Sequence, residues 1–310
     1  MSRAVVFAYH NVGVRCLLAL LARGVEVPLV VTHQDSPNED IWFGSVAQTA
    51  AAHGLKVITP EDVNSADVLA QVQGAAPDFL FSFYYRQMMG APLLQVAPRG
   101  AFNMHGSLLP RYRGRVPVNW AIIHGEAETG ATLHTMEVKP DAGAIVDQLA
   151  VPILPDDSAQ QVFDKVTVAA ETVLWRSLPA LLDGSAKPQP QDLAKGSYFG
   201  GRKPEDGRIG TNWTAQRVHD FVRALTHPYP GAFADLPQGR LRLWQTRRLG
   251  KIENAPLQVQ LQLRGDQLLL ACPEGAALQV LSATLGHAPL TPDNFKARMG
   301  ADAVALGALS

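Results

Sequence analysis

The sequence predicts an α/β domain built on a mainly parallel sheet, followed by a small domain of β-strands. Two observations carry this prediction. Through the first two-thirds of the chain, continuous apolar runs alternate with segments of helical periodicity, which is the rhythm of β-α-β units. After a connection rich in proline and glycine, the pattern changes to short β-like runs with a single helix.

The elements of the first domain follow in order along the chain. Residues 4–8 and 27–32 are continuous apolar runs, as expected for strands buried on both faces of a parallel sheet. Residues 14–21 between them have apolar side chains at helical spacing. Two further helices and one buried strand are predicted next, over residues 43–53, 62–73 and 79–83. This order predicts a Rossmann-like sheet with helices on both faces.

The second half of this domain changes character. Residues 131–136 and 144–151 alternate apolar with polar side chains and predict a pair of strands. Ser158 is followed three residues later by Gln161, the spacing of a capping box, so a long helix is predicted to begin there. Gly184 stands where that helix should end.

A polar connection starts at Lys187 and runs to about Gly210, and it contains the predicted domain boundary. We expect residues 1–203 to form the catalytic domain and residues 204–310 to form the second domain. One helix and four β-like runs are predicted there, over residues 215–225, 241–244, 257–263, 267–271 and 277–281. They suggest a small β-barrel.

Composition excludes several classes of function. With 310 residues, 47% hydrophobic and 18% charged, the chain has the profile of a soluble globular protein. A formal charge of −1 gives no basic footprint for nucleic acid. Cys16 and Cys272 lie far apart, so neither a disulfide framework nor a metal site is expected. We find no membrane-spanning run, no dinucleotide fingerprint and no P-loop, and expect a cytoplasmic protein.

The strongest chemical signal follows the apolar residues 100–102. Asn103 and His105 lie two residues apart on a predicted strand, so their side chains share one face. An amide can donate to a developing oxyanion while an imidazole moves a proton, which is what acyl transfer to an amine requires. Asp141 could hold the imidazole and favour its charged form. Taken alone, these residues are also ordinary turn formers.

The surrounding residues resemble the signature of folate-dependent formyltransferases, and the resemblance extends from Val5 to about Phe233. Its marks are Asn103, His105, residues 107–110, Gly114, Pro117, Trp120 and residues 141–143. The resemblance implies a formyltransferase that takes its formyl group from 10-formyltetrahydrofolate, without a metal. It further implies an OB-like second domain, and Asn103, His105 and Asp141 as catalytic residues.

The same resemblance implies where the folate binds. The expected contacts are Gln87, Met88, Met89, Arg115, Glu137, Val138, Lys139, Pro140 and Asp141. Met88 and Met89 would form an adaptable apolar wall, although packing in the core is the alternative. His10 and His33 follow strand ends on the carboxyl side and are candidates for lining the acceptor pocket. The remaining histidines, His134 among them, are expected to have surface or packing roles.

The acceptor has to be inferred from other segments. The acidic residues 32–40 after the second strand would repel a tRNA acceptor stem. Residues 7–10, 32–33, 43–47, 81–86, 102–141 and 228–233 resemble the formyltransferase part of bifunctional polymyxin-resistance enzymes. Those enzymes formylate UDP-4-amino-4-deoxy-L-arabinose for the modification of lipid A. This resemblance implies a small sugar-nucleotide partner, with neither nucleic acid nor membrane insertion, and leaves open a homo-oligomer.

Three hypotheses remain at this point, and formylation of a sugar nucleotide is the first of them. Methionyl-tRNA formylation is the second enzyme hypothesis, and a catalytically idle folate-binding subunit is the third. The bifunctional enzymes also continue into a nicotinamide-dependent half, whereas this sequence stops at Ser310. We therefore expect either a stand-alone enzyme or one domain of a longer one. The basic residues Arg240, Arg242, Arg247, Arg248 and Lys251 are expected to lie on a solvated strand edge.

Overall fold

The computed structural model describes residues 2–36 and 41–307, which form two compact units. Unit 1 contains Met1–Pro117, Glu128–Pro152 and Phe163–Gly200, and unit 2 contains Val118–Ala127, Ile153–Val162 and Gly201–Ser310. The units therefore interleave along the chain. The boundary expected between residues 203 and 204 stays a prediction.

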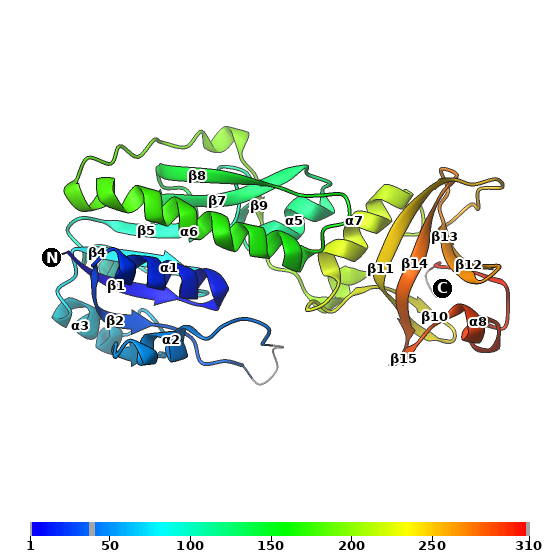
Figure 1. Ribbon diagram of the computed structural model, residues 1–310, viewed down its shortest axis with the longest axis horizontal. Helices are drawn as coiled ribbons and strands as arrows, with labels where there is room; N and C mark the ends of the chain where they lie inside the picture. The colour runs from blue at the N-terminus through cyan, green and yellow to red at the C-terminus, as the bar shows by residue number, and fades with distance from the viewer. Residues whose placement is uncertain (1, 37–40, 308–310) are drawn as a thin grey trace. The chain divides into compact units, whose positions relative to one another are not determined.

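Unit 1 is built on a seven-stranded sheet in the order β3-β2-β1-β4-β5-β7-β8 (Figure 1). The first five of these run parallel, β7 pairs with β5 antiparallel, and β8 pairs with β7 antiparallel. This arrangement confirms the predicted mainly parallel sheet. Its strands are β1 (Arg3–Ala8), β2 (Glu26–Val31), β3 (Val57–Ile58), β4 (Phe79–Phe83), β5 (Ala101–His105), β7 (Glu128–Thr135) and β8 (Ile145–Pro152).

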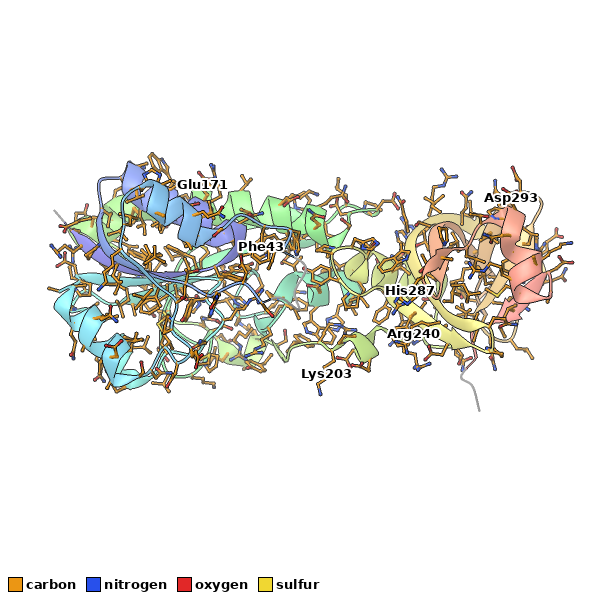
Figure 2. All side chains as sticks on the ribbon, turned by 90° about the horizontal axis from the view of Figure 1, so that it is seen from below. Phe43, Glu171, Lys203, Arg240, His287 and Asp293 are labelled. Atoms are coloured by element: carbon orange, nitrogen blue, oxygen red, sulfur yellow. The ribbon has the colours of Figure 1, made fainter. Side chains whose placement is uncertain are left out.

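Helices cover both faces of this sheet, as predicted. On one face α1 (His10–Ala22) contacts α2 (Val46–Ala52) and also α6 (Ala159–Asp183), where Arg15 Nε lies 2.8 Å from Glu171 Oε2. Glu171 is labelled on α6 in Figure 2. On the other face lie α3 (Ala66–Gly74) and α4 (Ala91–Leu94).

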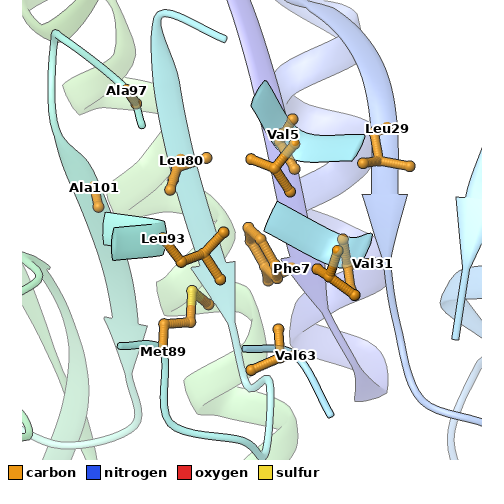
Figure 3. Packing of buried hydrophobic residues seen from close by; sticks show 12 residues of the cluster. Val5, Phe7, Leu29, Val31, Val63, Leu80, Met89, Leu93, Ala97 and Ala101 are labelled. Carbon is orange, nitrogen blue, oxygen red and sulfur yellow. The ribbon is translucent and has the colours of Figure 1, made fainter. Parts of the chain in front are cut away.

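The core beneath α3 and α4 is an apolar cluster made by the strands and both helices (Figure 3). Val5, Phe7 and Leu80 contribute from β1 and β4, and Leu93 contributes from α4. Phe7 and Leu80 are fully buried. Burying a side chain of this size stabilises a fold by about 1.5–3 kcal/mol relative to leaving it exposed. This cluster fixes the strands whose carboxyl ends carry the site described below.

Local capping sets the helix boundaries. The helix expected over residues 43–53 begins later, at Val46, because the side chain of Ser45 accepts a hydrogen bond from the Gln48 backbone and caps it. Ser158 and Gln161 form the predicted capping box at the start of α6, with reciprocal bonds of 2.8 and 3.3 Å. Gly184 follows the last residue of α6 with a φ of +81°.

Unit 2 contains a seven-stranded antiparallel sheet, curled into a half-barrel, in which six strands follow the order β10-β11-β14-β13-β12-β16 and β15 pairs with β14. This agrees with the predicted OB-like domain. Its elements are α5 (Pro117–Ile123, continuing from unit 1), η2 (Pro204–Gly207), α7 (Ala215–Leu225), β10 (Ala232–Leu236), β11 (Gly239–Lys251), β12 (Gln260–Arg264), β13 (Gln267–Ala271), β14 (Ala276–Leu285), β15 (Ala288–Pro289), α8 (Pro292–Met299) and β16 (Ala303–Ala305).

Two short strands in unit 1 hold the loop that follows β5. β6 (Arg113–Gly114) pairs in parallel with β9 (Tyr198–Phe199), which comes after the 3-10 turn η1 (Leu193–Lys195). Among residues 2–36 and 41–307, no helix is both long and apolar enough to span a bilayer.

Candidate active site

The register between β5 and β7 brings four polar side chains to one face of the sheet. Asn103 pairs with His134, and His105 pairs with Thr132. Directly opposed residues in an antiparallel pair project to the same side, as do residues two apart on a strand. Asn103 and His105 therefore share their face with His134, which sequence reasoning had assigned only to a surface or packing role.

His134 holds the amide of Asn103 in one orientation. Its Nδ1 donates to the backbone oxygen of Thr135 at 2.8 Å, so its Nε2 is free to accept from Asn103 Nδ2 at 3.1 Å. Burial lowers the pKa of His134 to about 4, and the nearby Asp141 only partly opposes this. The ring is therefore neutral near pH 7. One N–H of the Asn103 amide is bound to it, and the second is available to another acceptor.

His105 has one nitrogen fixed and the other directed at a carboxylate. Its Nε2 donates to the backbone oxygen of Tyr112 at 2.8 Å, and its Nδ1 lies 3.5 Å from Asp141 Oδ1. The residue is only 7% exposed. Because Nε2 is held as a donor to Tyr112, Nδ1 is the ring nitrogen that faces the carboxylate of Asp141.

Backbone geometry explains the Asp141-Ala142-Gly143 turn. Asp141 has a φ of +51°, and its Oδ2 accepts from the Gly114 backbone at 2.8 Å. A Cβ on Gly143 would lie 1.8 Å from the backbone oxygen of Thr135, so only glycine fits there. Gln191 ties the turn down through its Nε2, which donates to the Asp141 oxygen at 3.0 Å and the Gly143 oxygen at 2.6 Å.

The loop after β5 is anchored to the same face. Thr132 Oγ1 donates to the backbone oxygen of Ser107 at 2.6 Å, and Ser107 Oγ donates to the backbone oxygen of Arg111 at the same distance. Gln148 Nε2 donates to both Leu109 O and Thr132 Oγ1 at 2.8 Å. These bonds account for the Ser-Leu-Leu-Pro part of the signature, because they hold the loop after β5 in place. From this loop, Tyr112 accepts a hydrogen bond from His105 and Gly114 donates one to Asp141.

The residues expected to contact folate divide into two groups. Met88 and Val138 are 54% and 64% exposed, unusual values for apolar side chains, while Met89 is 4% exposed and packs in the core cluster (Figure 3). The side chain of Gln87 forms a hydrogen bond within the protein, since its Oε1 accepts from the Val63 backbone N–H at 2.8 Å. Three charged side chains of the set are exposed, namely Arg115, Glu137 and Lys139, whereas the side chain of Asp141 is only 13% exposed.

The two acceptor-side candidates lie beyond the carboxyl ends of β1 and β2. His10 has a φ of +67° and is 8% exposed, with its ring centroid 3.9 Å from that of Phe43 and 4.4 Å from that of Phe163. Burial, with Arg86 nearby, lowers the pKa of His10 to about 3. His33 stacks on Tyr85 at 4.2 Å and accepts from the Arg86 backbone through Nε2.

Tyr84 links the His10 side of the sheet to the loop after β5. Its ring centroid lies 6.5 Å from that of His10, and a Cβ on Gly106 would lie 1.8 Å from its hydroxyl. Of the acidic segment expected after β2, Asp35 accepts from the Tyr9 hydroxyl at 2.7 Å. Residues 37–40 lie outside the described ranges. Within those ranges, no group of three or more potential ligands is arranged to hold a metal ion.

Comparison with known families decides the class of this protein. A family model described as formyl transferase matches residues 5–178, and one described as formyl transferase, C-terminal domain, matches residues 202–299. The first match alone covers more than half of the chain. The chain belongs to the formyl transferase family. It is therefore an enzyme, and Asn103, His105 and Asp141 all lie in the segment that the first model matches.

Solved structures share the fold of this formyltransferase at low sequence identity. An N-formyltransferase from Helicobacter canadensis, in complex with folinic acid and dTDP-3-aminofucose, has a TM-score of 0.69 at 19% identity, over 90% of this chain and 99% of its own. WlaRD, a sugar 3N-formyl transferase determined with dTDP and 5-N-formyl-THF, has a TM-score of 0.69 at 18% identity, over 93% and 98%. HypX from Aquifex aeolicus, in complex with tetrahydrofolic acid, has a TM-score of 0.63 at 17% identity, over 95% of this chain but 46% of its own.

Because His134 is buried in its neutral form, it makes the stability of this formyltransferase depend on pH. Between pH 6.5 and about 4, the unfolded chain binds a proton at His134 that the folded protein does not. The free energy of unfolding should therefore fall as the pH falls through this window, with His134 contributing at most about 1.4 kcal/mol per pH unit. Urea unfolding at several pH values should show a shallower slope for His134→Gln. The same change at the exposed His287 (Figure 2) should leave the slope unaltered, and equal slopes in all three proteins would contradict the assignment.

Proposed function

We propose that this formyltransferase transfers the formyl group of 10-formyltetrahydrofolate to the 4-amine of UDP-4-amino-4-deoxy-L-arabinose, a step toward aminoarabinose-modified lipid A. The observation that carries formyl transfer is the set formed by Asn103, His105 and Asp141, with His134 orienting the amide. The choice of a sugar nucleotide is supported by the sequence resemblance and by the solved sugar N-formyltransferases of the same fold.

In the proposed mechanism, Asn103 stabilises the negative charge that develops on the formyl oxygen. Its second Nδ2–H is uncommitted, and His134 prevents the amide from turning away. A preorganised amide donor of this kind lowers the barrier without titrating. Because Nε2 of His105 is already bound to the Tyr112 oxygen, the pair formed by His105 Nδ1 and Asp141 Oδ1, 3.5 Å apart, takes the proton that the attacking amine loses and returns it to the departing nitrogen.

On the donor side, the exposed apolar residues fit a planar folate ring. Met88 and Val138 lie on separate segments, but their neighbours Met89 and Met136 both pack against the same core cluster. Two such segments offer apolar surface for the pterin ring of the folate, which would position the formyl group that N10 carries next to the ring. The exposed guanidinium of Arg115 suits the carboxylates of the folate tail. Met89 supports this surface from below, since its side chain lies in the core.

On the acceptor side, His10 offers a neutral imidazole in an aromatic enclosure. Its Nδ1 is buried and meets no hydrogen-bond partner among the described residues. With its pKa lowered to about 3, the His10 ring is neutral near pH 7. It can therefore accept a hydrogen bond from an ammonium or hydroxyl group without repelling a positively charged ligand. An amino sugar carries both groups. We therefore place the sugar next to His10 and Tyr84.

A direct assay tests the proposed function. The purified protein is incubated with 10-formyltetrahydrofolate and UDP-4-amino-4-deoxy-L-arabinose, and the sugar nucleotide is followed by mass spectrometry. A gain of one formyl group, matched by release of tetrahydrofolate, is the expected result. If only a dTDP-linked 3-amino sugar were formylated, the acceptor would be a sugar like the dTDP-3-aminofucose bound to the solved N-formyltransferase, and the UDP-sugar would be wrong. Formylation of methionyl-tRNA alone would overturn the sugar-nucleotide assignment.

Substitution of the proposed catalytic residues should separate chemistry from folding. We expect Asn103→Ala and His105→Ala each to lower kcat/KM by about 10²–10³-fold, the usual cost of losing an oxyanion donor or a proton-transfer group. Asp141→Asn should lower activity by removing the charge that faces Nδ1. The exposed His53→Ala is a matched control and should keep full activity. Circular dichroism checks the fold of each variant, and a fully active Asn103→Ala protein would refute the mechanism.

A further inference from the structure

Unit 2 contains a pocket of about 700 Å³ that the proposed function does not use. It is lined by the end of α5, by η2 and by the first turns of α7. The volume lies within the range of small-molecule sites in proteins. Its walls combine aromatic rings with guanidinium groups, namely Trp120, Trp213, Phe221, Arg202 and Arg217.

Arg202 is held in this pocket without a carboxylate. Its guanidinium lies 4.7 Å from the ring centroid of Trp120 and 5.4 Å from that of Phe221. Nη2 donates to the backbone oxygen of Asp206 at 2.6 Å, and no carboxylate of the described residues comes within ion-pair distance. Burial lowers the pKa of this side chain. A partly buried cation of this kind gains free energy when an anion joins it.

Arg217 supplies a second guanidinium of the same type. It lies 4.2 Å above the ring of Trp213, and its side chain has no hydrogen-bond or ion-pair partner in the described part of the chain. Gly210 allows this arrangement, because a Cβ there would lie 2.2 Å from the indole nitrogen of Trp213. A guanidinium stacked on an indole keeps its planar edge of donors free for an oxyanion.

The carboxylates and the third arginine of the pocket are already engaged. Asp220 Oδ1 accepts from Arg223 Nε at 2.9 Å and Nη2 at 2.7 Å, and Asp206 Oδ2 accepts from the Lys203 backbone at 2.7 Å. Arg208 is paired with Asp235. The cations left for a ligand are therefore Arg202 and Arg217, beside the carboxylate of Asp206, whose negative charge acts on Arg202.

We propose that this pocket binds a nucleoside diphosphate, with Arg202 and Arg217 gripping the phosphates and the aromatic walls meeting the base. The guanidinium groups of Arg202 and Arg217, each stacked on an aromatic ring, can donate pairs of N–H bonds to phosphate oxygens. Rings such as Trp120 offer stacking surface of the kind that nucleobases use. The inference goes beyond the proposed function, since it assigns a ligand to unit 2 and depends on no turnover.

Calorimetric titration of the full chain with UDP, without any formyl donor, tests the proposal. UDP should bind, with an affinity that falls as salt is raised. Arg217→Gln should weaken binding by about tenfold or more, as expected for the loss of a charge-assisted pair. Arg217→Lys should also weaken it, because an ammonium lacks the planar fork. The control is Arg247→Gln, which changes an exposed arginine of β11 outside the pocket and should leave the affinity unchanged.

Arg202→Gln gives a second, independent variant, and its fold is checked by circular dichroism. The proposal is wrong if UDP does not bind, or if neither Arg202→Gln nor Arg217→Gln reduces its affinity. It is also wrong if uridine binds as tightly as UDP, which would remove the role of the phosphates. Inorganic phosphate that binds as tightly as UDP would show a simple anion site and overturn the nucleotide part. If UDP binds but neither arginine variant changes its affinity, the pocket in unit 2 is refuted and the proposed function stands, whereas a failure of UDP to bind at all would count against both proposals. Formylation of the sugar by Arg202→Gln and Arg217→Gln at the wild-type rate would leave the proposed function intact whatever the titration shows.

Discussion

The antiparallel pairing of β7 with β5 is the constraint on which the proposed site depends. It places His134 opposite Asn103 and Thr132 opposite His105, so that all four side chains reach one face. A slip of one residue would turn every side chain of β7 to the other face. His134 and Thr132 would then point away from Asn103 and from the loop after β5. The chemistry of the site therefore depends on backbone hydrogen bonds that contain no catalytic atom.

His105 and His134 are buried, Asn103 and Asp141 are partly buried, and each of the four side chains has a defined partner. His134 is neutral and bonded at both ring nitrogens, and His105 is bonded at Nε2 and faces a carboxylate at Nδ1. Asp141 reaches this position because Gly143 lets its turn approach β7 closely and because Gly114 donates to its carboxylate. A satisfied network of this kind is rigid, and rigidity gives an oxyanion donor its effect.

Features set by local sequence were predicted well. The strand over residues 79–83 has the expected limits, and Ser158 and Gln161 cap α6 as their spacing indicated. The shared face of Asn103 and His105 follows from strand geometry alone. The role of His134 could not be predicted in this way, because it depends on the register between segments about thirty residues apart. Met89 likewise enters the core through packing beside α4 that its own neighbours in sequence do not determine.

The central claim is that His134 acts through Asn103, and a double-mutant cycle on kcat/KM for formyl transfer tests it most directly. His134→Gln should lower kcat/KM by roughly tenfold in the wild-type background, and it should cost little once Asn103 is alanine, because the group that it orients is gone. Such strong coupling is the result that this account predicts. Equal losses from His134→Gln in both backgrounds, in variants that fold normally, would show that His134 acts independently of Asn103 and would contradict it.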